Sequence, residues 1–383
     1  MLAICNVTAT LSNGTALDLI TSNLTLDDSW TPYAQASLVI IPPANLDLID
    51  PRAAPTVTLN YHQHFGPVQP VSVLSAAWGG RLVSALSAAW SGKAVSALST
   101  AYGSGTFIDG EAYRDPIDRV AVLHIRRRRR NTDGSADIDL ASAEALLADL
   151  RSMQGGARLY SASTLRELVG DIFEELNAAT AHTFTLAVGD ADTPVAPSPT
   201  LSPGQSYIDF FTPYLQAGNL RLWADELGLF HLSMADAILT GALVLSVATN
   251  VEGATDEIDR DGDLWADSVV VEYNDPETGT GYISAYPQDG RTISKTRHVR
   301  VDAYPPFDQF TAPDEVDLAA KNIYDRLQGR GREVPIDAVS DFSATPGTPV
   351  AATLLTGTLT GVVRAVEWRT PENTMTITTR DIN

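Results

Sequence analysis

The alternation of apolar and polar residues predicts β-strands over most of the first 127 residues. Ile4–Leu11 and Leu17–Leu26 are separated by Ser12-Asn13-Gly14, a strong turn signal. Thr56–Tyr61 and Val120–Ile125 repeat the same alternating pattern further along the chain. Short strands at this spacing, punctuated by glycine and proline, predict a small β-barrel or β-sandwich.

The stretch Leu24–Pro43 (LTLDDSWTPYAQASLVIIPP) reads as a strand, an acidic corner and a second strand. Asp27-Asp28-Ser29 forms the polar corner, and Pro32 fixes the backbone just after it. Ala36–Ile41 is apolar at almost every position until Pro42-Pro43 ends it. We expect this second strand to be buried on both faces, by a sandwich, a closed barrel or a neighbouring subunit.

A repeat of 12 residues covers 71–82, 83–94 and 95–106 (VSVLSAAWGGRL, VSALSAAWSGKA, VSALSTAYGSGT). In a continuous α-helix each copy would be rotated by about a third of a turn from the last, so no single apolar face would form. A long amphipathic membrane helix is therefore disfavoured. We expect three short elements, ended by glycines, in an elaborated loop over 66–106 that packs on a neighbouring surface.

Residues 131–235 predict a mixed α/β segment. A helix is expected from Asp139 to Leu150, and the capping box Thr164-Leu-Arg-Glu167 opens a second helix. Further elements are a third helix over Ser206–Gln216 and a hairpin over Leu220–Leu232. The buried stripe of the second helix is predicted from helical spacing. It comprises Leu165, Leu168, Val169, Ile172, Phe173 and Leu176.

The rest of the chain returns to β patterns. We expect a second β-barrel over 236–310, with strands at Leu243–Val247, Ser268–Asn274, Gly281–Ala285 and His298–Val301. Residues 311–383 predict a helix that starts near Pro313 and ends at Gly329, followed by a C-terminal β-region. The strands of that region are expected at Val334–Val339, Val350–Leu355, Leu359–Trp368 and Met375–Thr379.

Three of these features resemble the tail hub family of tailed bacteriophages, also called baseplate hub or minor tail proteins. They are the acidic corner followed by W-x-P-Y-x-Q-A-x-L at residues 30–38, the valine-rich strand at 268–274 before a Gly-Thr-Gly turn, and the final V-x-x-V-x-W hairpin at 363–368. The order of β, α/β and β modules also resembles that family. The resemblance implies a mainly β fold with an α/β insertion and two tube-forming β-barrels per chain.

The same resemblance implies a homotrimeric ring with pseudo-sixfold symmetry, joining a sixfold tail tube to a threefold tip. Its expected partners are the distal tail protein, the tape measure protein and the receptor-binding or tail-tip proteins. The expected location is the virion tail tip or baseplate, after synthesis in the bacterial cytoplasm. The predicted domains are a first barrel at 1–130, an α/β insertion at 131–235, a second barrel at 236–310 and a helix plus β-region at 311–383. The repeat loop is a candidate tip that contacts the host envelope or another tail protein.

The net charge of the chain argues against nucleic-acid binding. The 383 residues carry a net charge of −21, the wrong sign for binding nucleic acid through its phosphates. An acidic channel would instead let DNA pass without specific binding. Arg126–Arg130 is the one strongly basic run. It has two interpretations: a solvated strand end that forms ion pairs with acidic residues of the same chain, or an inter-subunit clamp that binds acidic residues of a neighbouring subunit. Neither a signal peptide nor stable membrane insertion is expected, and the single Cys5 excludes a disulfide framework.

The best candidate ligand site is a metal site formed by Asp259, Asp261, Asp263 and Asp267. Alternating aspartates around a glycine can place several oxygens on a hard cation such as Ca²⁺, although the glycine and final glutamate of an EF-hand loop are displaced or missing. The alternative is an acidic loop that binds no metal. No catalytic motif occurs, so we expect no enzyme and no cofactor beyond a possible Ca²⁺. Two other functions stay open: a tail-associated cell-wall hydrolase or a fragment of one, and a calcium-dependent host-surface-binding protein.

Overall fold

The computed structural model is described for most of the chain. The described residues are 3–29, 31–65, 116–153, 155–189, 191–195, 199–235, 237–247, 249–258, 265–274, 281–287, 289, 293–301, 312–328 and 332–380. The repeat at 71–106 and the loop residues 259–264 lie outside them, so the expectations for the repeat loop stay predictions.

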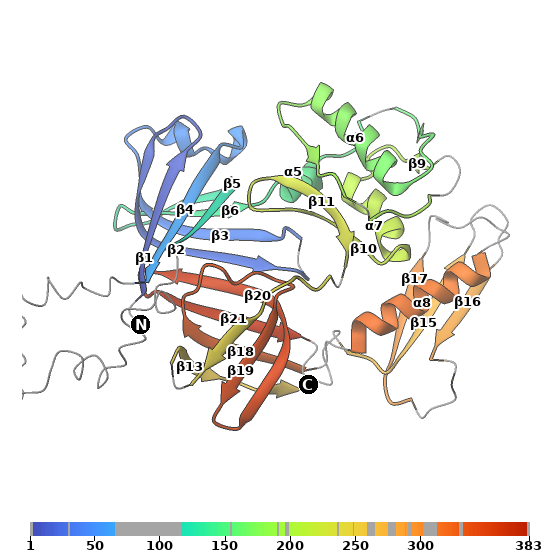
Figure 1. Ribbon diagram of the computed structural model, residues 1–383. Helices are drawn as coiled ribbons and strands as arrows, with labels where there is room; N and C mark the ends of the chain where they lie inside the picture. Colours follow the sequence, from blue (N-terminus) through green and yellow to red (C-terminus); the bar gives the residue numbers. More distant parts are fainter. Residues whose placement is uncertain are drawn as a thin grey trace, which may run out of the picture.

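The first domain is a closed antiparallel barrel of six strands in the order β1-β4-β5-β6-β3-β2, with β2 pairing back to β1 (Figure 1). The barrel closes where Ala9 and Thr10 of β1 pair with Leu17 and Ala16 of β2. Its strands are β1 (Ala3–Leu11), β2 (Ala16–Asp27), β3 (Ala34–Ile41), β4 (Thr56–Phe65), β5 (Ile117–Arg130) and β6 (Ala136–Ala141). Two short 3₁₀ turns, Leu46–Ile49 and Pro51–Ala53, connect β3 to β4.

The expectation that β3 is buried on both faces is wrong within one chain. Leu38 and Ile40 are fully buried in the barrel, whereas Ser37 is exposed and Ile41 is 58% exposed. Successive side chains of a strand point to opposite faces, and in this chain only the inner face of β3 has a partner layer. The apolar outer end of β3 is therefore left without cover.

The α/β insertion follows the first barrel and has its own core. It contains α5 (Glu144–Asp149), α6 (Leu165–Ala179), α7 (Tyr207–Ala217) and the hairpin β10 (Leu220–Ala224) with β11 (Leu229–Met234). Short pairs are formed by β7 (Arg158–Leu159) with β9 (Thr200–Leu201), and by β8 (Thr185–Leu186) with β11.

The N-cap at Thr164 and the buried stripe of α6 are confirmed, and the reciprocal bond of the capping box goes to Ser163 N, one residue before the N-cap. Thr164 Oγ1 accepts a hydrogen bond from Glu167 N at 3.3 Å, and the Glu167 carboxylate accepts one from Ser163 N at 2.8 Å. All six residues of the predicted stripe are buried. The expected helix from Asp139 to Leu150 is wrong in its first half, because Ala136–Ala141 alternates inward and outward and pairs as β6 with both β3 and β5.

The second barrel-like domain is built from two distant parts of the chain. Its strand order is β12-β19-β20-β21-β18-β13, with β14 also pairing to β18. The strands are β12 (Leu243–Ser246), β13 (Val251–Ala254), β14 (Glu257–Ile258), β18 (Arg332–Val339), β19 (Pro349–Leu354), β20 (Gly357–Thr370) and β21 (Thr374–Arg380). No pairing joins β12 to β13 among the described residues; Asn250 spans this opening, accepting from Ser246 N at 2.8 Å through its side chain and from Val339 N at 2.9 Å through its backbone oxygen.

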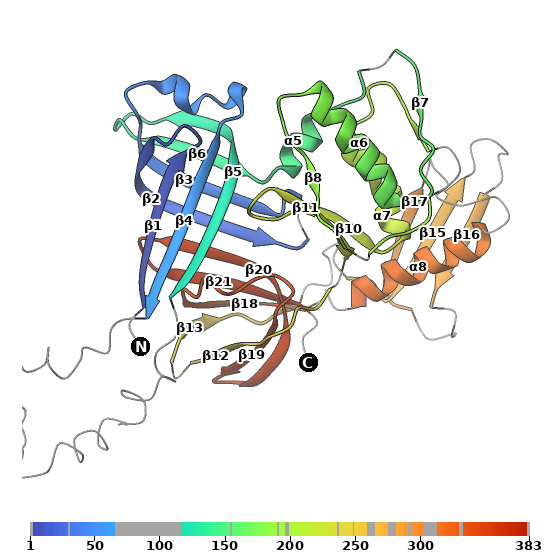
Figure 2. The same ribbon diagram turned by 45° about the horizontal axis from the view of Figure 1, so that its top comes forward.

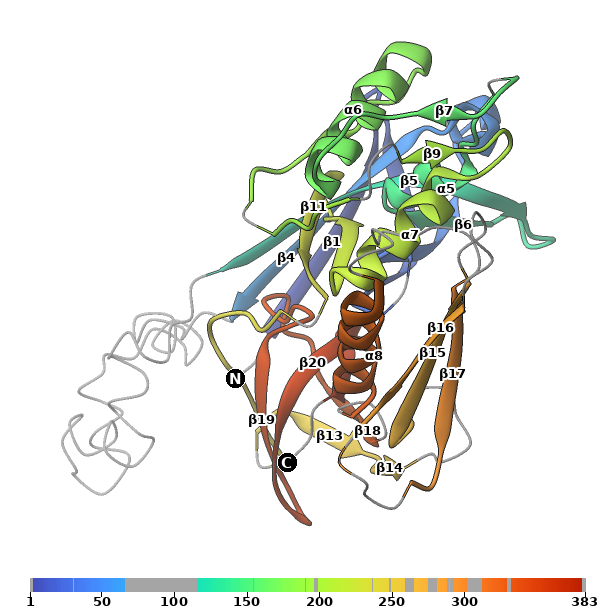
Figure 3. The same ribbon diagram turned by 90° about the vertical axis from the view of Figure 1, so that its right-hand side faces the viewer.

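The expected second barrel at 236–310 therefore needs correction. Residues 268–328 form a separate unit, in which β15 (Ser268–Asn274) lies between β16 (Gly281–Tyr286) and β17 (Thr296–Val301). One face of this sheet is covered by α8 (Ala312–Gln328), as Figure 3 shows. Val269 and Val271 of β15 are buried in a core shared with α8 rather than in a barrel. The C-terminal β-region is itself most of the second barrel.

Candidate functional site: the joint between the two barrels

The two barrels share a continuous sheet. β2 of the first barrel pairs with β20 of the second in antiparallel register, from Ser22 opposite Thr370 to Asp27 opposite Ala365. With 14 residues, β20 is long enough to pair with β2, β19 and β21. Figure 2 shows the second barrel directly beneath the first along this junction. A change in the angle between the barrels would have to break this ladder.

Buried polar side chains fasten the joint behind the ladder. Gln63 of β4 is fully buried. Its side-chain amide donates a hydrogen bond to Ser340 O and accepts one from Phe342 N at 3.0 Å. Ser22 Oγ lies 3.1 Å from both Tyr61 Oη and Thr370 Oγ1. These contacts tie β4 and β2 of the first barrel to the 340–348 loop and β20 of the second barrel.

Arg119 of β5 connects three parts of the molecule. Its guanidinium donates to Phe342 O at 2.8 Å, to Ala344 O at 3.0 Å and to Thr345 Oγ1 at 2.7 Å, all in the 340–348 loop. It also forms an ion pair with Glu226, in the β10–β11 turn of the insertion. The same guanidinium lies 4.7 Å from the centre of the Trp368 ring, a cation–π geometry.

The acidic corner after β2 is the second polar centre of the joint. Arg380 at the end of β21 lies 3.2 Å from the Asp28 carboxylate, and both side chains are almost fully buried. Arg221 of the insertion donates to Asp27 O at 3.1 Å and lies 5.1 Å from the centre of the Tyr33 ring. The corner identified in the sequence is thus the point where both barrels and the insertion meet.

Glu144, at the start of α5, lies within this corner. Its side chain is fully buried and accepts hydrogen bonds from Tyr33 N and, at 2.9 Å, from Ser142 Oγ. Burial raises the pKa of Glu144 to about 7. Burial also lowers the pKa of Arg221, whose positive charge favours the ionised form of Glu144. The joint therefore contains one carboxyl group whose charge changes near neutral pH.

Most arginines of the run Arg126–Arg130 form ion pairs or hydrogen bonds within the same chain. Arg126 forms a bidentate pair with Asp149 at 2.6 and 2.8 Å, Arg127 pairs with Asp139 at 2.5 Å, and Arg128 donates to Leu46 O at 2.6 Å. Arg129 and Arg130 are exposed near the end of the β5–β6 hairpin. These contacts support the reading of a strand end that pairs with acidic residues of the chain.

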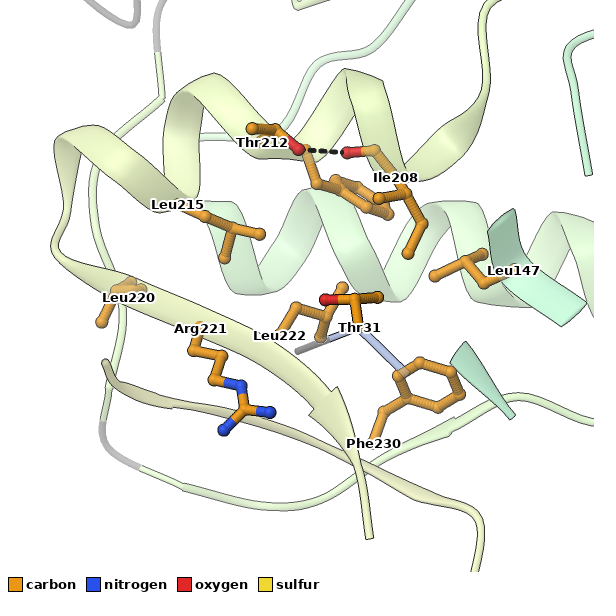
Figure 4. A pocket seen from close by; sticks show the side chains of 10 residues that line it. Thr31, Leu147, Ile208, Thr212, Leu215, Leu220, Arg221, Leu222 and Phe230 are labelled. Atoms are coloured by element: carbon orange, nitrogen blue, oxygen red, sulfur yellow. Dashed lines mark hydrogen bonds between the residues drawn. The ribbon is translucent and has the colours of Figure 1, made fainter. Parts of the chain in front are cut away.

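A small cavity lies between α7 and β10 of the insertion (Figure 4). Its volume is about 120 Å³, well below the roughly 300–1,000 Å³ of ligand pockets. The figure shows Arg221 on β10 with its guanidinium turned away from α7. The lining is otherwise mainly apolar, and the space fits a side chain rather than a cofactor. The lining residues are Thr31, Leu147, Ile208, Phe211, Thr212, Leu215, Leu220, Arg221, Leu222 and Phe230.

The predicted calcium site is described only at Asp267. Its carboxylate accepts hydrogen bonds from Ser294 N, Ser294 Oγ and Lys295 N at 2.6–2.7 Å, so it caps the turn before β17. Asp259, Asp261 and Asp263 lie outside the described residues. Within the part of the chain that is described, no cluster of three or more metal-ligating side chains occurs. Ca²⁺ binding by the four aspartates stays a prediction.

Sequence reasoning missed the charged and amide residues of the joint. Arg119, Gln63 and Arg380 each lie one or two residues outside a predicted strand, where they look like ordinary exposed residues. A weak signal was available at Arg119, an arginine one position before the apolar run Val120–Leu123. Its partners are more than 100 residues away along the chain, and no local pattern identifies them.

The fold is that of phage tail proteins, as the resemblance predicted. The tail protein from Neisseria meningitidis MC58 matches 98% of this chain and 96% of its own, with 11% identity and a TM-score of 0.58. The 43 kDa tail protein of prophage MuSo2 from Shewanella oneidensis matches 99% of this chain and 100% of its own, with 10% identity and a TM-score of 0.59. The mainly β fold class with an α/β insertion is confirmed.

A third match is a protein of a bacterial secretion system. The E. coli c3393 protein is described as a component of the type VI secretion system with structural similarity to the T4 bacteriophage tail proteins gp27 and gp5. It matches over 97% of this chain and 75% of its own, with 10% identity and a TM-score of 0.50. None of these three proteins is described as an enzyme. No family model and no curated protein matches the sequence. Among the described residues, no helix has the length and apolarity needed to cross a membrane.

Proposed function

We propose that this protein is a structural hub of a phage tail, located at the tail tip or baseplate of the virion and without enzymatic activity. The observation that carries the proposal is the joint: two barrels locked at one angle by a shared sheet and by buried ionic contacts. The likeness to tail proteins along nearly the whole chain supports the same function. A hub transmits mechanical load, and a rigid joint suits that task.

Two barrels per chain also fit the symmetry that a hub must bridge. Three chains would present six barrels to a sixfold tail tube while keeping threefold symmetry toward the tip. The other tail proteins expected to contact this ring are the distal tail protein, the tape measure protein and the receptor-binding proteins. The net charge of −21 would keep the phosphates of passing DNA from binding to the ring.

The test is the mass and symmetry of the assembled protein. Native mass spectrometry over a range of concentrations is expected to show three chains of 40.9 kDa each. Averaged micrographs of the particle should show threefold order with six similar densities around a channel. A particle that stays monomeric at every concentration, or one with twofold symmetry, would overturn the proposal. A clearing band in a peptidoglycan zymogram would instead favour the cell-wall hydrolase.

A further inference from the structure

The first residues of the insertion are anchored to the first barrel through the side chain of Glu144. Glu144 Oε2 accepts hydrogen bonds from Tyr33 N, just before β3, and from Ser142 Oγ at 2.9 Å. Ser142 Oγ also lies 3.4 Å from Ala34 N, and Ser142 N donates to Ala34 O at 2.9 Å. The carboxyl group of Glu144 therefore completes a short set of hydrogen bonds that joins α5 to the start of β3.

This carboxyl group is fully buried, and its surroundings suit the neutral form. Its second oxygen, Oε1, is buried and makes no hydrogen bond of normal geometry, although the backbone N–H of Ala224 on β10 lies beside the carboxyl group. A buried oxygen without a full hydrogen bond costs much more free energy when it belongs to a charged group. A protonated Glu144 keeps its contact with Ser142 by donating to Ser142 Oγ, because a hydroxyl oxygen can also accept.

The charged side chains around Glu144 balance one another without it. Asp27 and Asp28, at the end of β2, both face Arg221 of β10. Arg380 of β21 pairs with Asp28. These two acidic and two basic groups leave no net charge at the corner, so an ionised Glu144 would add a third negative charge. The cation that faces Glu144 itself is Arg221.

Other titratable groups lie along the same boundary between the first barrel and the insertion. Burial raises the pKa of the Tyr33 phenol far above its usual value, so this group stays neutral, and the Arg119–Glu226 pair acts on it with both signs of charge. His124 of β5 faces His182 of the insertion, with ring centres 6.3 Å apart. Burial lowers the pKa of His124, so this contact gains charge only in acid. Its effect on the boundary has the opposite sign to that of Glu144.

We propose that Glu144 is a proton-controlled latch: in its neutral form it holds the insertion against the first barrel, and on ionisation it releases α5 from Tyr33. In the closed arrangement the charged carboxylate is cut off from water, whereas release exposes it to solvent. The β2–β20 ladder does not involve Glu144, so the two barrels keep their angle in both arrangements.

The pH range of the latch follows from the two arrangements. Glu144 titrates at about pH 7 when it is closed and near its ordinary value of 4.5 when it is released. Release therefore becomes about tenfold more favourable for each pH unit between these values and gains little above pH 7. Low pH closes the latch, and neutral or higher pH loosens it. The inference goes beyond the proposed hub function and does not depend on it.

The test is hydrogen–deuterium exchange of the full chain from pH 6 to pH 8, with rates corrected for the intrinsic pH dependence of exchange. Protection of the Tyr33 amide, which donates to Glu144, should fall about tenfold in the wild type. Amides of the β2–β20 ladder, such as that of Leu24, are the internal reference and should keep their protection. Glu144→Gln mimics the neutral form, so its Tyr33 protection should not fall. The matched control Glu174→Gln, at an exposed carboxyl group of α6, should behave as the wild type.

The latch would be overturned by Tyr33 protection that stays constant from pH 6 to pH 8 in the wild type. A fall of equal size in Glu144→Gln would overturn it as well. If Glu144→Gln does not fold, the wild type still decides: a fall confined to Tyr33 and residues 144–147 supports the latch, and a fall shared by the ladder amides refutes it. A chain that never forms a trimer would overturn the hub function and leave the latch standing.

Discussion

Replacing Arg119 by methionine is the sharpest test of the joint. Methionine keeps an apolar stem but removes the guanidinium that lies over the Trp368 ring, with its charge and all its hydrogen-bond donors. The change leaves Phe342 O, Ala344 O and the Glu226 carboxylate without this partner. Arg119 and Glu226 have side chains that are only 12% and 19% exposed, so water replaces the lost contacts poorly.

The expected cost follows from these contacts. A buried acceptor without a donor costs about 1–3 kcal/mol, and breaking a buried ion pair from one side costs about 3–5 kcal/mol. The terms overlap, so we expect the loss of about 3–5 kcal/mol in the unfolding step that separates the barrels. Urea unfolding followed by tryptophan fluorescence is a suitable assay, because Trp368 is fully buried at this joint. Proteolysis within residues 340–348 should accelerate in parallel.

The matched control is Arg52→Met, which removes an arginine that is 90% exposed and paired with Asp50. Exposed pairs contribute little, so this variant should unfold with the wild type. A double-mutant cycle with Glu226→Gln isolates the coupling between Arg119 and the insertion. The reasoning would be refuted if Arg119→Met were no less stable than Arg52→Met, or if the 340–348 loop kept its protease resistance.

Three further predictions concern other sites. Because the pKa of Glu144 is raised, the contribution of its protonated form to stability is fully present below about pH 4.5 and is lost as pH rises through about 7. Glu144→Gln should remove up to about 3 kcal/mol of this pH dependence, measured from melting curves at pH 5 and pH 8. Thr164→Ala should cost about 1 kcal/mol through the lost cap of α6, whereas Thr132→Ala in an exposed turn should cost nothing measurable. If the acidic loop binds Ca²⁺, calorimetry should show heat that Asp261→Asn abolishes; Asp267→Asn should loosen the 293–295 turn with or without Ca²⁺.

Local patterns predicted the elements of this fold well because their causes are local. The cap at Thr164, the stripe of α6 and the strands of the first barrel follow from residues within about ten positions of one another. The corner at Asp27-Asp28-Ser29 was also recognisable, since consecutive acidic residues interrupt an apolar strand. These features needed no knowledge of distant partners.

The predicted domain boundaries after residue 235 were wrong because they depend on which strands pair with each other, and local patterns do not show this. Ser268–Asn274 and Val334–Val339 both read as apolar strands, and the pattern does not state which joins a barrel. The structure assigns β15 to a sheet under α8, where it pairs with the next two strands, and β18 to the barrel, where it pairs with the more distant β13 and β21. Likewise, the sequence alone suggests that Arg119 and Gln63 are exposed, whereas in the structure both form hydrogen bonds with the 340–348 loop.

The distribution of charge links the joint to the surface. Within the described barrels, charged residues such as Arg119, Asp28 and Arg380 are placed inside the molecule, where removal of one partner leaves the other buried and costly. Such contacts have few alternative geometries, so they fix the angle between the barrels more narrowly than an apolar seam would. The stretches 237–251 and 342–363 around Val244, by contrast, hold no charged residue. A polar joint of this kind is the arrangement expected when two barrels of one chain must keep a fixed angle to each other.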